Sequence, residues 1–151
     1  MPFTPADFKN PQALERVRGL FAQATFLRHI GVQLSDVGPG WAETSLEVAP
    51  HHGQAEGFVH AGVQATLADH TAGTASGSLV AADEGVLTVE FKVNLLRPAA
   101  GERLTCRAEV IRAGKRLMFT EARVSAWRGG EQKLVATFSG TIAVVSLRAE
   151  P

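Results

Sequence analysis

Residues 54–80, QAEGFVHAGVQATLADHTAGTASGSLV, decide the fold of this chain. A loop marked by Gly53 and Gly57 leads into a segment with small or apolar residues on nearly every side of a helix. A helix of this kind must be buried, because it has no polar face to present to water. We therefore predict one long, buried, central helix from about His60 to Val80.

Asp69 lies in the middle of this helix, among residues that are almost all small or apolar. A carboxylate removed from water costs free energy unless it is paired, hydrogen-bonded or neutralised. Acids in such surroundings are often functional groups. We interpret Asp69 as a catalytic residue. The alternative is a structural carboxylate held by Thr66 or by a neighbouring chain.

The chain before the central helix is predicted to form a helix and a hairpin. Apolar residues recur at three- and four-residue spacing after Pro11, which predicts an amphipathic helix ending near Arg28. The residues with this spacing are Ala13, Leu14, Val17, Leu20, Phe21 and Ala24. Rough alternation on both sides of a turn at residues 38–40 then predicts a β-hairpin.

Four further strands joined by tight turns are predicted after the central helix. The first covers residues 86–96, and we expect its apolar residues to share one face. These residues are Leu87, Val89, Phe91, Val93 and Leu95. The other strands cover about residues 103–113, 116–127 and 133–147. Short connections favour antiparallel pairing, and this element order indicates the α+β class.

We therefore expect an antiparallel sheet of five to six strands wrapped around one long central helix. Residues 1–30 are predicted to be an N-terminal helical segment that packs on a domain of residues 31–148. The first helix covers little of the broad sheet, so we expect a second subunit to cover more of it.

Composition limits the partners that this chain can bind. The 151 residues suit one domain with a real core, and the 15 basic residues balance the 15 acidic ones. No overall charge therefore attracts nucleic acid or an anionic membrane. We see no secretory signal and no run long enough to span a bilayer. A single cysteine, Cys106, excludes an intramolecular disulfide and fits a reducing, cytoplasmic setting.

Four histidines near the central segment raise the question of a metal site. His51 and His52 point in opposite directions if the chain is extended, and His70 lies about 100° around the helix from Asp69. No cysteine lies near them or near His60. We therefore predict that no metal is bound.

The segment 57–69, GFVHAGVQATLAD, followed by VNLLRPA at residues 93–99, resembles a known family. It is similar to the hotdog-fold acyl-CoA thioesterases of the phenylacetate-degradation type, within the 4-hydroxybenzoyl-CoA thioesterase superfamily. In that family the helix begins His-Gly-Gly, and an acidic residue follows nine positions after the histidine. His60 and Asp69 keep this spacing, Gly62 keeps the second glycine, and Ala61 replaces the first. The resemblance implies a hotdog fold and the hydrolysis of an acyl-CoA to a free acid and coenzyme A.

The resemblance also implies roles at the start and middle of the helix. Asp69 would act as a general base, or as a nucleophile that forms a transient anhydride, and both routes stay open. The backbone N–H groups of Ala61 and Gly62 would form the oxyanion hole, where free amides and the helix dipole favour negative charge. His60 would contact the substrate, or it would only hold the loop.

The remaining implied site residues would contact water or coenzyme A. Gln54 lies where the family carries an Asn or Gln that orients the carbonyl or the attacking water. Thr88 matches a Ser or Thr that positions the water in some members. For coenzyme A, whose phosphates need cations or amides, the resemblance points to Arg97, Lys92, Asn94, Arg112, Lys115 and Arg116. The alternatives are ordinary loop residues and a solvated strand face, and no separate cofactor is expected.

The spacing of Ala61 and Asp69 predicts an oligomer. The two residues are eight positions apart, which is about 12 Å along a straight helix at about 1.5 Å per residue. One thioester carbonyl cannot touch both residues of one helix. If both act on the same substrate, they must come from two antiparallel helices of two chains. We expect a homodimer at least, and a homotetramer as the assembly.

Two other functions compete with thioester hydrolysis. A non-catalytic acyl-CoA-binding or sensing module would keep the pocket and the basic residues, but it would not need Asp69. A hotdog dehydratase or hydratase would pair a helix-borne acid with a loop histidine in a different motif. Because Asp69 is present and the neighbouring motif differs, hydrolysis is the leading prediction.

Overall fold

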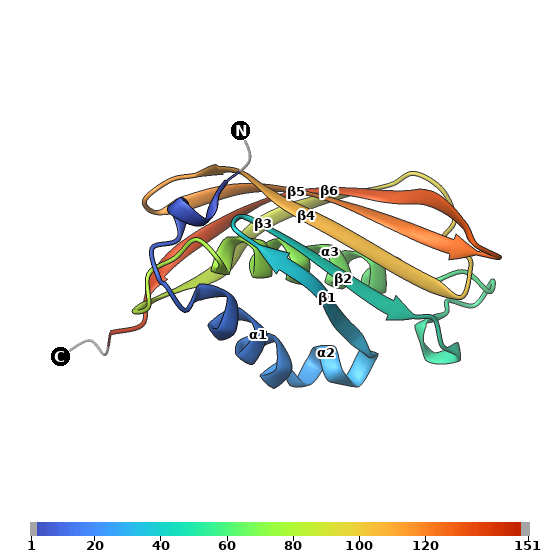
Figure 1. Ribbon diagram of the computed structural model, residues 1–151. Helices are drawn as coiled ribbons and strands as arrows, with labels where there is room; N and C mark the ends of the chain where they lie inside the picture. The colour runs from blue at the N-terminus through green and yellow to red at the C-terminus, as the bar shows by residue number, and fades with distance from the viewer. Residues whose placement is uncertain (1–2, 149–151) are drawn as a thin grey trace.

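The computed structural model describes residues 3–148, in which an antiparallel sheet of six strands wraps around one long helix, α3 (Figure 1). The α+β hotdog arrangement predicted from the sequence is confirmed. Short 3-10 helices span Pro5–Asp7 and Pro50–His52. The α-helices are α1 (Ala13–Gln23), α2 (Thr25–Ile30) and α3 (Ala61–Gly77). The strands are β1 (Val32–Gly38), β2 (Trp41–Glu47), β3 (Glu84–Leu95), β4 (Arg103–Ala113), β5 (Leu117–Arg128) and β6 (Glu131–Ser146).

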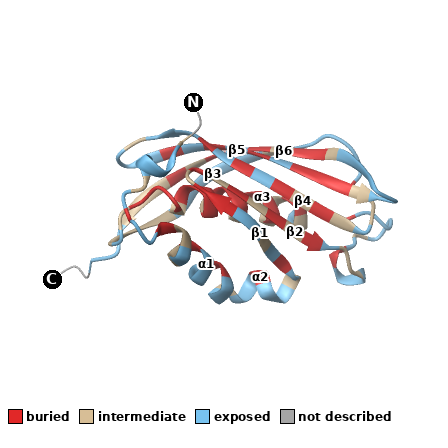
Figure 2. Ribbon diagram, in the orientation of Figure 1, coloured by how far each residue is buried: buried red, intermediate tan, exposed pale blue. Residues whose placement is uncertain are grey.

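Helix α3 is the centre of the core. Leu67, Ala68, Thr71, Ala72 and Ala75 have no exposed surface. Eight of the 17 residues of α3 are buried, and only Ala61 and Gly62 at its start are exposed; Figure 2 shows the helix beneath the sheet. Small side chains allow the strands to approach the helix closely, which explains why a helix without a polar face forms here. The helix ends at Gly77, three residues before the predicted end at Val80.

The order of the strands differs from the one that the short connections predicted. The sheet runs β1-β2-β4-β5-β6-β3, so β3 pairs with β6 and does not pair with β4. The connection from β3 to β4, at residues 96–102, crosses two intervening strands instead of forming a tight turn. Seven extended residues reach up to about 24 Å, which exceeds the roughly 14 Å from β3 to β4 across the sheet. As a result, β3 forms one edge of the sheet.

The N-terminal helix is divided, which corrects the prediction of one helix ending near Arg28. Ala24 is extended (φ −70°, ψ 95°) and separates α1 from α2. Phe21 and Leu27 are both buried. On one straight helix these two residues would lie roughly 120° apart at about 100° per residue, so the chain must change direction to bury both. Leu20, predicted to belong to the buried stripe, is 54% exposed.

Strand β3 does not carry its five predicted apolar residues on one face. The register with β6 shifts between Thr88 and Glu90, so Val89 is an extra residue in a β-bulge. A bulge reverses the alternation beyond it. Thr88 lies opposite the buried Ile142. Beyond the bulge the side chains opposite Gly140, Phe138 and Ala136 are those of Phe91, Val93 and Leu95.

The three α-helices lie on one face of the sheet, and the opposite face carries no α-helix among the described residues (Figure 1). Buried Val17, Phe21 and Leu27 of α1 and α2 belong to the same core as α3. The division of the chain at residue 30 therefore separates two segments that share one core, and its assignment as a domain boundary stays a prediction.

Candidate active site

His60 caps the start of α3. Its Nδ1 accepts a hydrogen bond of 2.8 Å from the backbone N–H of Gly62, and its carbonyl accepts one of 3.0 Å from Val63. An Nδ1 that accepts leaves the ring proton on Nε2. Of the two predicted oxyanion donors, the Gly62 N–H is therefore engaged within the helix cap. The Ala61 N–H has no hydrogen-bond partner within residues 3–148.

The loop before α3 is closed on itself around Gln54. The Gln54 N–H donates to the Phe58 carbonyl at 2.8 Å, and the side-chain Oε1 accepts from the Glu56 N–H at 3.0 Å. Gly57 has φ +82°, which a residue with a side chain rarely adopts. Gln54 thus stabilises the loop with its oxygen. A cavity of about 700 Å³ at the start of α3 is lined by Gln54, His60, Ala61, Gln64, Leu96 and Arg97, among others.

Asp69 and Thr88 meet between the middle of α3 and the first half of β3. The Thr88 hydroxyl donates a hydrogen bond of 2.8 Å to Oδ1 of Asp69. Asp69 is only partly buried in the single chain, which corrects the prediction of a carboxylate enclosed in the core. The reason is that Asp69 lies on the side of α3 that borders an open groove beside α1 and β3. Its Oδ2 has no hydrogen-bond partner among the described residues.

His70 lies beside Asp69 in this groove. Its ring packs edge-on against Phe21 of α1, with 5.2 Å between the ring centres. Burial lowers the pKa of His70 below its ordinary value of 6.5, and the neighbouring Asp69 carboxylate opposes the shift. His70 is therefore neutral at pH 7.

Ala61 and Asp69 border two different cavities. The groove at Asp69 has a volume of about 290 Å³ and shares no lining residue with the cavity at Ala61. Both residues lie on α3, eight positions and about 12 Å apart at about 1.5 Å per residue. Within one chain, the carboxylate and the free amide thus do not face one reacting carbonyl.

The six residues predicted to bind coenzyme A do not gather in one chain. Arg97 lies beyond the end of β3 and lines the cavity at the start of α3. Lys115 and Arg116 lie in the turn between β4 and β5. The Arg116 carbonyl accepts a hydrogen bond from the Val144 N–H. Val144 pairs with Val86, so this turn lies beside the start of β3. The 12 residues of β3 span roughly 36 Å at about 3.3 Å per residue. The two groups therefore lie at opposite ends of the sheet.

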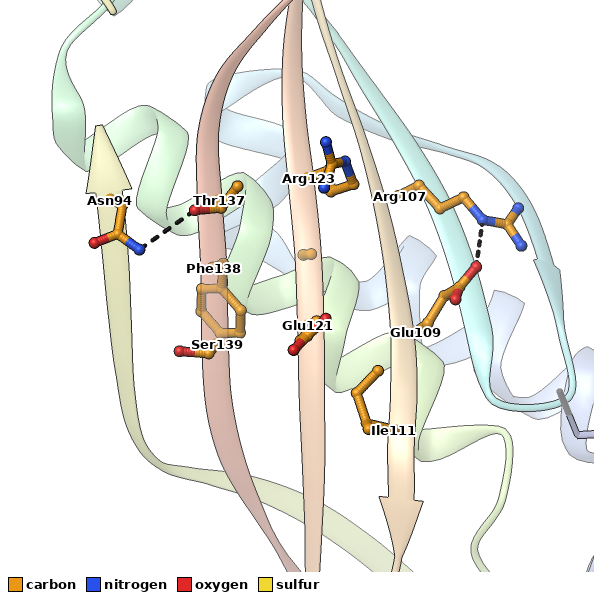
Figure 3. Close-up of a pocket in the computed structure, with 10 residues that line it drawn as sticks. Asn94, Arg107, Glu109, Ile111, Glu121, Arg123, Thr137, Phe138 and Ser139 are labelled. Carbon is orange, nitrogen blue, oxygen red and sulfur yellow. Dashed lines mark hydrogen bonds and ion pairs between the residues drawn. The ribbon is translucent and has the colours of Figure 1, made fainter. Parts of the chain in front are cut away.

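Three of these residues lie away from both cavities on α3. Asn94 donates to the Thr137 hydroxyl at 3.3 Å and lines a further cavity of about 400 Å³. Figure 3 shows the residues that line this cavity on the neighbouring strands β3, β6, β5 and β4, with α3 behind the strands. Lys92, two residues from Asn94, is exposed on the same strand. Arg112 lies opposite Phe119 near the end of β4. No residue that lines this cavity also lines either cavity on α3.

The sequence interpretation missed most of the groove beside Asp69. Its lining includes Val17 and Phe21 of α1, Gly73 and Gly77 of α3, and Leu87 of β3. One signal was available: glycines follow Asp69 at intervals of four residues, which places all three on one side of a helix. The contribution of α1 had no signal in the sequence, because it depends on how two distant segments pack.

Two predicted absences concern metals and membranes. Within residues 3–148, no group of three or more His, Cys, Asp and Glu side chains is placed to hold a metal ion. The prediction of no metal and no separate cofactor stays a prediction. Every helix in that part of the chain is too short or too polar to cross a bilayer.

The sequence matches a known protein family. Residues 56–133 match the family described as the Thioesterase superfamily. The chain is 31% identical over 119 residues to a 1,4-dihydroxy-2-naphthoyl-CoA hydrolase of Listeria monocytogenes, covering 79% of this chain and 94% of the relative. The matched segment contains the start of α3, Asp69 and Thr88.

Two solved structures share the fold. A thioesterase family protein from Silicibacter pomeroyi superposes with a TM-score of 0.86 at 37% identity, covering 87% of this chain and 97% of that one. A variant of the phenylacetic acid degradation protein PaaI from Thermus thermophilus superposes with a TM-score of 0.69 at 26% identity, covering 79% and 97%.

Proposed function

Because this chain belongs to the Thioesterase superfamily, with a hotdog fold of the phenylacetate-degradation type, we propose that it hydrolyses acyl-CoA thioesters to a free acid and coenzyme A. It is a thioester hydrolase by its family. The observation that carries the finer proposal is the contact between Asp69 and Thr88 at an open groove.

Asp69 is the proposed reacting group. Thr88 holds Oδ1 by its hydrogen bond and leaves Oδ2 available on the groove side. As a general base, Asp69 takes a proton from water while the water oxygen attacks the thioester carbonyl. The C–S bond then breaks, and the coenzyme A thiolate takes a proton. As a nucleophile, Asp69 would itself displace the thiolate and form a mixed anhydride, which water then hydrolyses.

The Ala61 N–H of a second chain is the proposed oxyanion donor. It has no hydrogen-bond partner among residues 3–148 and lies at the start of α3, where the amides and the helix dipole favour a developing negative charge. Asp69 and Ala61 of one chain border separate cavities, so one substrate needs Asp69 from one chain and Ala61 from another. His60 supports this donor by capping the helix, and Gln54 supports the loop beside it.

The unpaired edge of β3 supports a two-fold dimer. Leu87, Val89, Phe91, Leu95 and Leu96 on or beside this edge strand are between 44% and 62% exposed. An exposed edge with apolar side chains is a template for pairing with another strand. We expect two β3 strands to pair antiparallel across the two-fold axis and to extend the sheet across both chains.

This dimer also gathers the separated site residues. Thr88 contacts Asp69, and Leu95 lines the cavity of Ala61. A two-fold axis between Phe91 and Lys92 would place Thr88 of one chain opposite Leu95 of the other, and thus Asp69 near the second chain's Ala61. It would also bring Arg97 of one chain to the end of the other chain that carries the β4–β5 turn.

The predicted basic residues would then surround one coenzyme A. Arg97 would come from one chain, and the other chain would supply Arg112, Lys115 and Arg116. Lys92 and Asn94 would lie beside the two-fold axis. The sheet face without helices offers a second surface for assembly, and we expect a homotetramer to use it.

Release of free thiol from acyl-CoA by the wild type, Asp69→Asn and Asp36→Asn tests the proposal. Asp36 forms a surface ion pair with Arg18, so Asp36→Asn controls for the loss of a carboxylate. We expect Asp69→Asn to lower kcat by about 100- to 10,000-fold and Asp36→Asn to leave it unchanged. The protein thiol does not disturb this assay, because burial raises the pKa of Cys106 to about 12. Unchanged turnover by Asp69→Asn would refute the role of Asp69.

A further inference from the structure

The groove beside Asp69 is lined by the helices α1 and α3 and by the strands β3 and β6, and it is mostly apolar. It has a volume of about 290 Å³ and runs between α1, α3 and β3. Cavities that bind small organic ligands usually have about 300–1,000 Å³ and apolar walls with a few polar groups, so this groove is at the small end of that range. The proposed reacting carboxylate lies in its wall.

Two glycines of α3 form the floor of the groove. Asp69, Gly73 and Gly77 follow at intervals of four residues on one side of the helix, over about 12 Å at about 1.5 Å per residue. A Cβ added at Gly73 would have no heavy atom within 4 Å, whereas one at Gly77 would lie 3.6 Å from Val17 of α1. The groove is thus open at Gly73 and narrows at Gly77, where α1 approaches α3.

The walls have no group that would bind a second charge. Val17, Leu20 and Phe21 of α1 form one wall, and Val86 and Leu87 of β3 the other. Among the described residues no lysine, arginine or glutamate lines the groove, and burial against Phe21 lowers the pKa of His70, the other titratable group beside Asp69. The Thr74 hydroxyl is already bonded to the His70 carbonyl at 2.8 Å.

We propose that this groove binds the acyl group of the substrate, that Gly73 sets the length it accepts, and that the acyl group is uncharged, apolar and of moderate size. The proposal rests on the proposed function, because Asp69 must meet the carbonyl at the mouth of the groove. An acyl group attached to that carbonyl extends from Asp69 past Gly73 toward Gly77. A side chain at Gly73 would fill the groove there and leave room only for the part of the acyl group between Asp69 and Gly73.

Substitution of Gly73 tests the length limit, with Gly19 as the matched control. Both glycines lie in helices, and a Cβ added at either one meets no heavy atom within 4 Å, but Gly19 is on the exposed side of α1. Both substitutions should therefore leave the fold intact, which thermal unfolding checks. The substrates are acetyl-, butyryl-, hexanoyl-, octanoyl- and phenylacetyl-CoA.

We expect Gly73→Leu to lower kcat/KM for the longer acyl groups by about 10- to 200-fold relative to acetyl-CoA. Gly73→Ala should give a smaller change in the same direction. Gly19→Leu should keep the wild-type preference. An unchanged chain-length preference in Gly73→Leu would overturn the proposal, even if every variant hydrolyses acyl-CoA.

Binding of a thioether analogue tests the groove proposal independently of thioester hydrolysis. S-hexyl-CoA cannot be hydrolysed, and its Kd by calorimetry reports the groove without any turnover. We expect Gly73→Leu to weaken binding by about tenfold or more and Gly19→Leu to leave it unchanged. Equal Kd values for the wild type, Gly73→Leu and Gly19→Leu would overturn the groove proposal. Binding of S-hexyl-CoA by a wild type that does not hydrolyse acyl-CoA would overturn only the proposed function.

A second experiment tests whether the acyl group is uncharged. It compares hexanoyl-CoA with adipyl-CoA, whose acyl group has the same number of carbons and a terminal carboxylate. The described residues of this chain place no cation in the groove, and Arg97 of a second chain is assigned to the coenzyme A phosphates, so a carboxylate there would lose its hydration and find no counter-charge. We expect kcat/KM for adipyl-CoA to be lower by at least about tenfold. Equal rates for the two substrates would contradict an uncharged acyl group.

Discussion

The start and the middle of α3 form two different environments. The start borders a wide cavity of about 700 Å³, with a free amide at Ala61 and a cation at Arg97. The middle borders a groove of about 290 Å³ with apolar walls and the Asp69 carboxylate. The first environment suits an oxyanion and phosphates, and the second suits an acyl group. From this contrast we infer that each chain holds two half-sites, and we expect a second copy to bring them together.

Mixing two inactive variants tests most directly whether the two half-sites act together. Asp69→Asn removes the carboxylate, and Ala61→Pro removes the amide while keeping a residue that helices accept at their first position. We expect each variant alone to lose about 100-fold or more of kcat. In a mixed dimer, one site joins the intact Asp69 of one chain to the intact Ala61 of the other.

Random mixing of the two variants should restore about one quarter of the wild-type turnover, because half of the dimers are mixed and each has one intact site. The measurement is thiol release after the two proteins are unfolded together and refolded. Refolding each variant alone is the control. A mixture as inactive as its components would show that the two half-sites do not meet.

Charges on the edge of β3 should separate the half-sites. Val89→Lys with Leu95→Lys places two cations on an edge whose side chains are now 58% and 52% exposed. We expect a monomer in sedimentation and a loss of kcat of about 100- to 1,000-fold, equal to the loss of an oxyanion donor. Phe26→Lys on α2, 60% exposed, is the control and should stay dimeric and active. A fully active monomer would falsify the shared site.

Removal of the Thr88 hydroxyl tests the half-site at Asp69 alone. Thr88→Val keeps the shape of the side chain and deletes its hydrogen bond to Asp69. Hydrogen bonds to charged groups contribute about 1.5–3 kcal/mol, so we expect kcat to fall by about 10- to 100-fold with little change in KM. Thr141→Val, which deletes a similar hydrogen bond to Glu90, should leave both constants unchanged. A change in KM alone would show that Thr88 binds the substrate and does not position Asp69.

The smallest expected effect is the dependence of stability on the charge of His70. Its folded-state pKa lies below the unfolded value of 6.5, so the unfolded chain binds more protons in this range. The free energy of unfolding should fall as the pH drops below about 6.5, and should not change through this group above it. Urea unfolding between about pH 5 and about pH 7.5 should show a smaller fall for His70→Gln. The same fall in both proteins would assign it to other groups.

The features that were predicted best are those that depend on local spacing. Small and apolar residues on nearly every side predicted a helix from about His60 with Asp69 in its middle, and α3 begins at Ala61 and contains Asp69. The hairpin of β1 and β2 followed from alternation around the turn at residues 38–40. Both patterns repeat within a few residues, so they can be read without knowledge of the partners.

The failed predictions all concern contacts between distant segments. The bulge at Val89 depends on how β3 pairs with β6, and the groove depends on how α1 packs against α3. The break at Ala24 lets Phe21 and Leu27 enter the same core. The residues that the resemblance assigns to coenzyme A lie at the two ends of the sheet in one chain, and their role stays a prediction.

The amino-acid sequence by itself determined the central helix, the position of Asp69 on it, and an antiparallel sheet of five to six strands around it. Periodic burial is a property of neighbouring residues, and it predicts which face turns inward as long as the element is regular. The tertiary structure alone decided that β3 becomes an exposed edge and that Thr88 reaches Asp69. It also decided that Gly73 borders an open groove. These features arise when segments far apart in the chain pack into the same core, and the spacing of residues along the chain does not predict them.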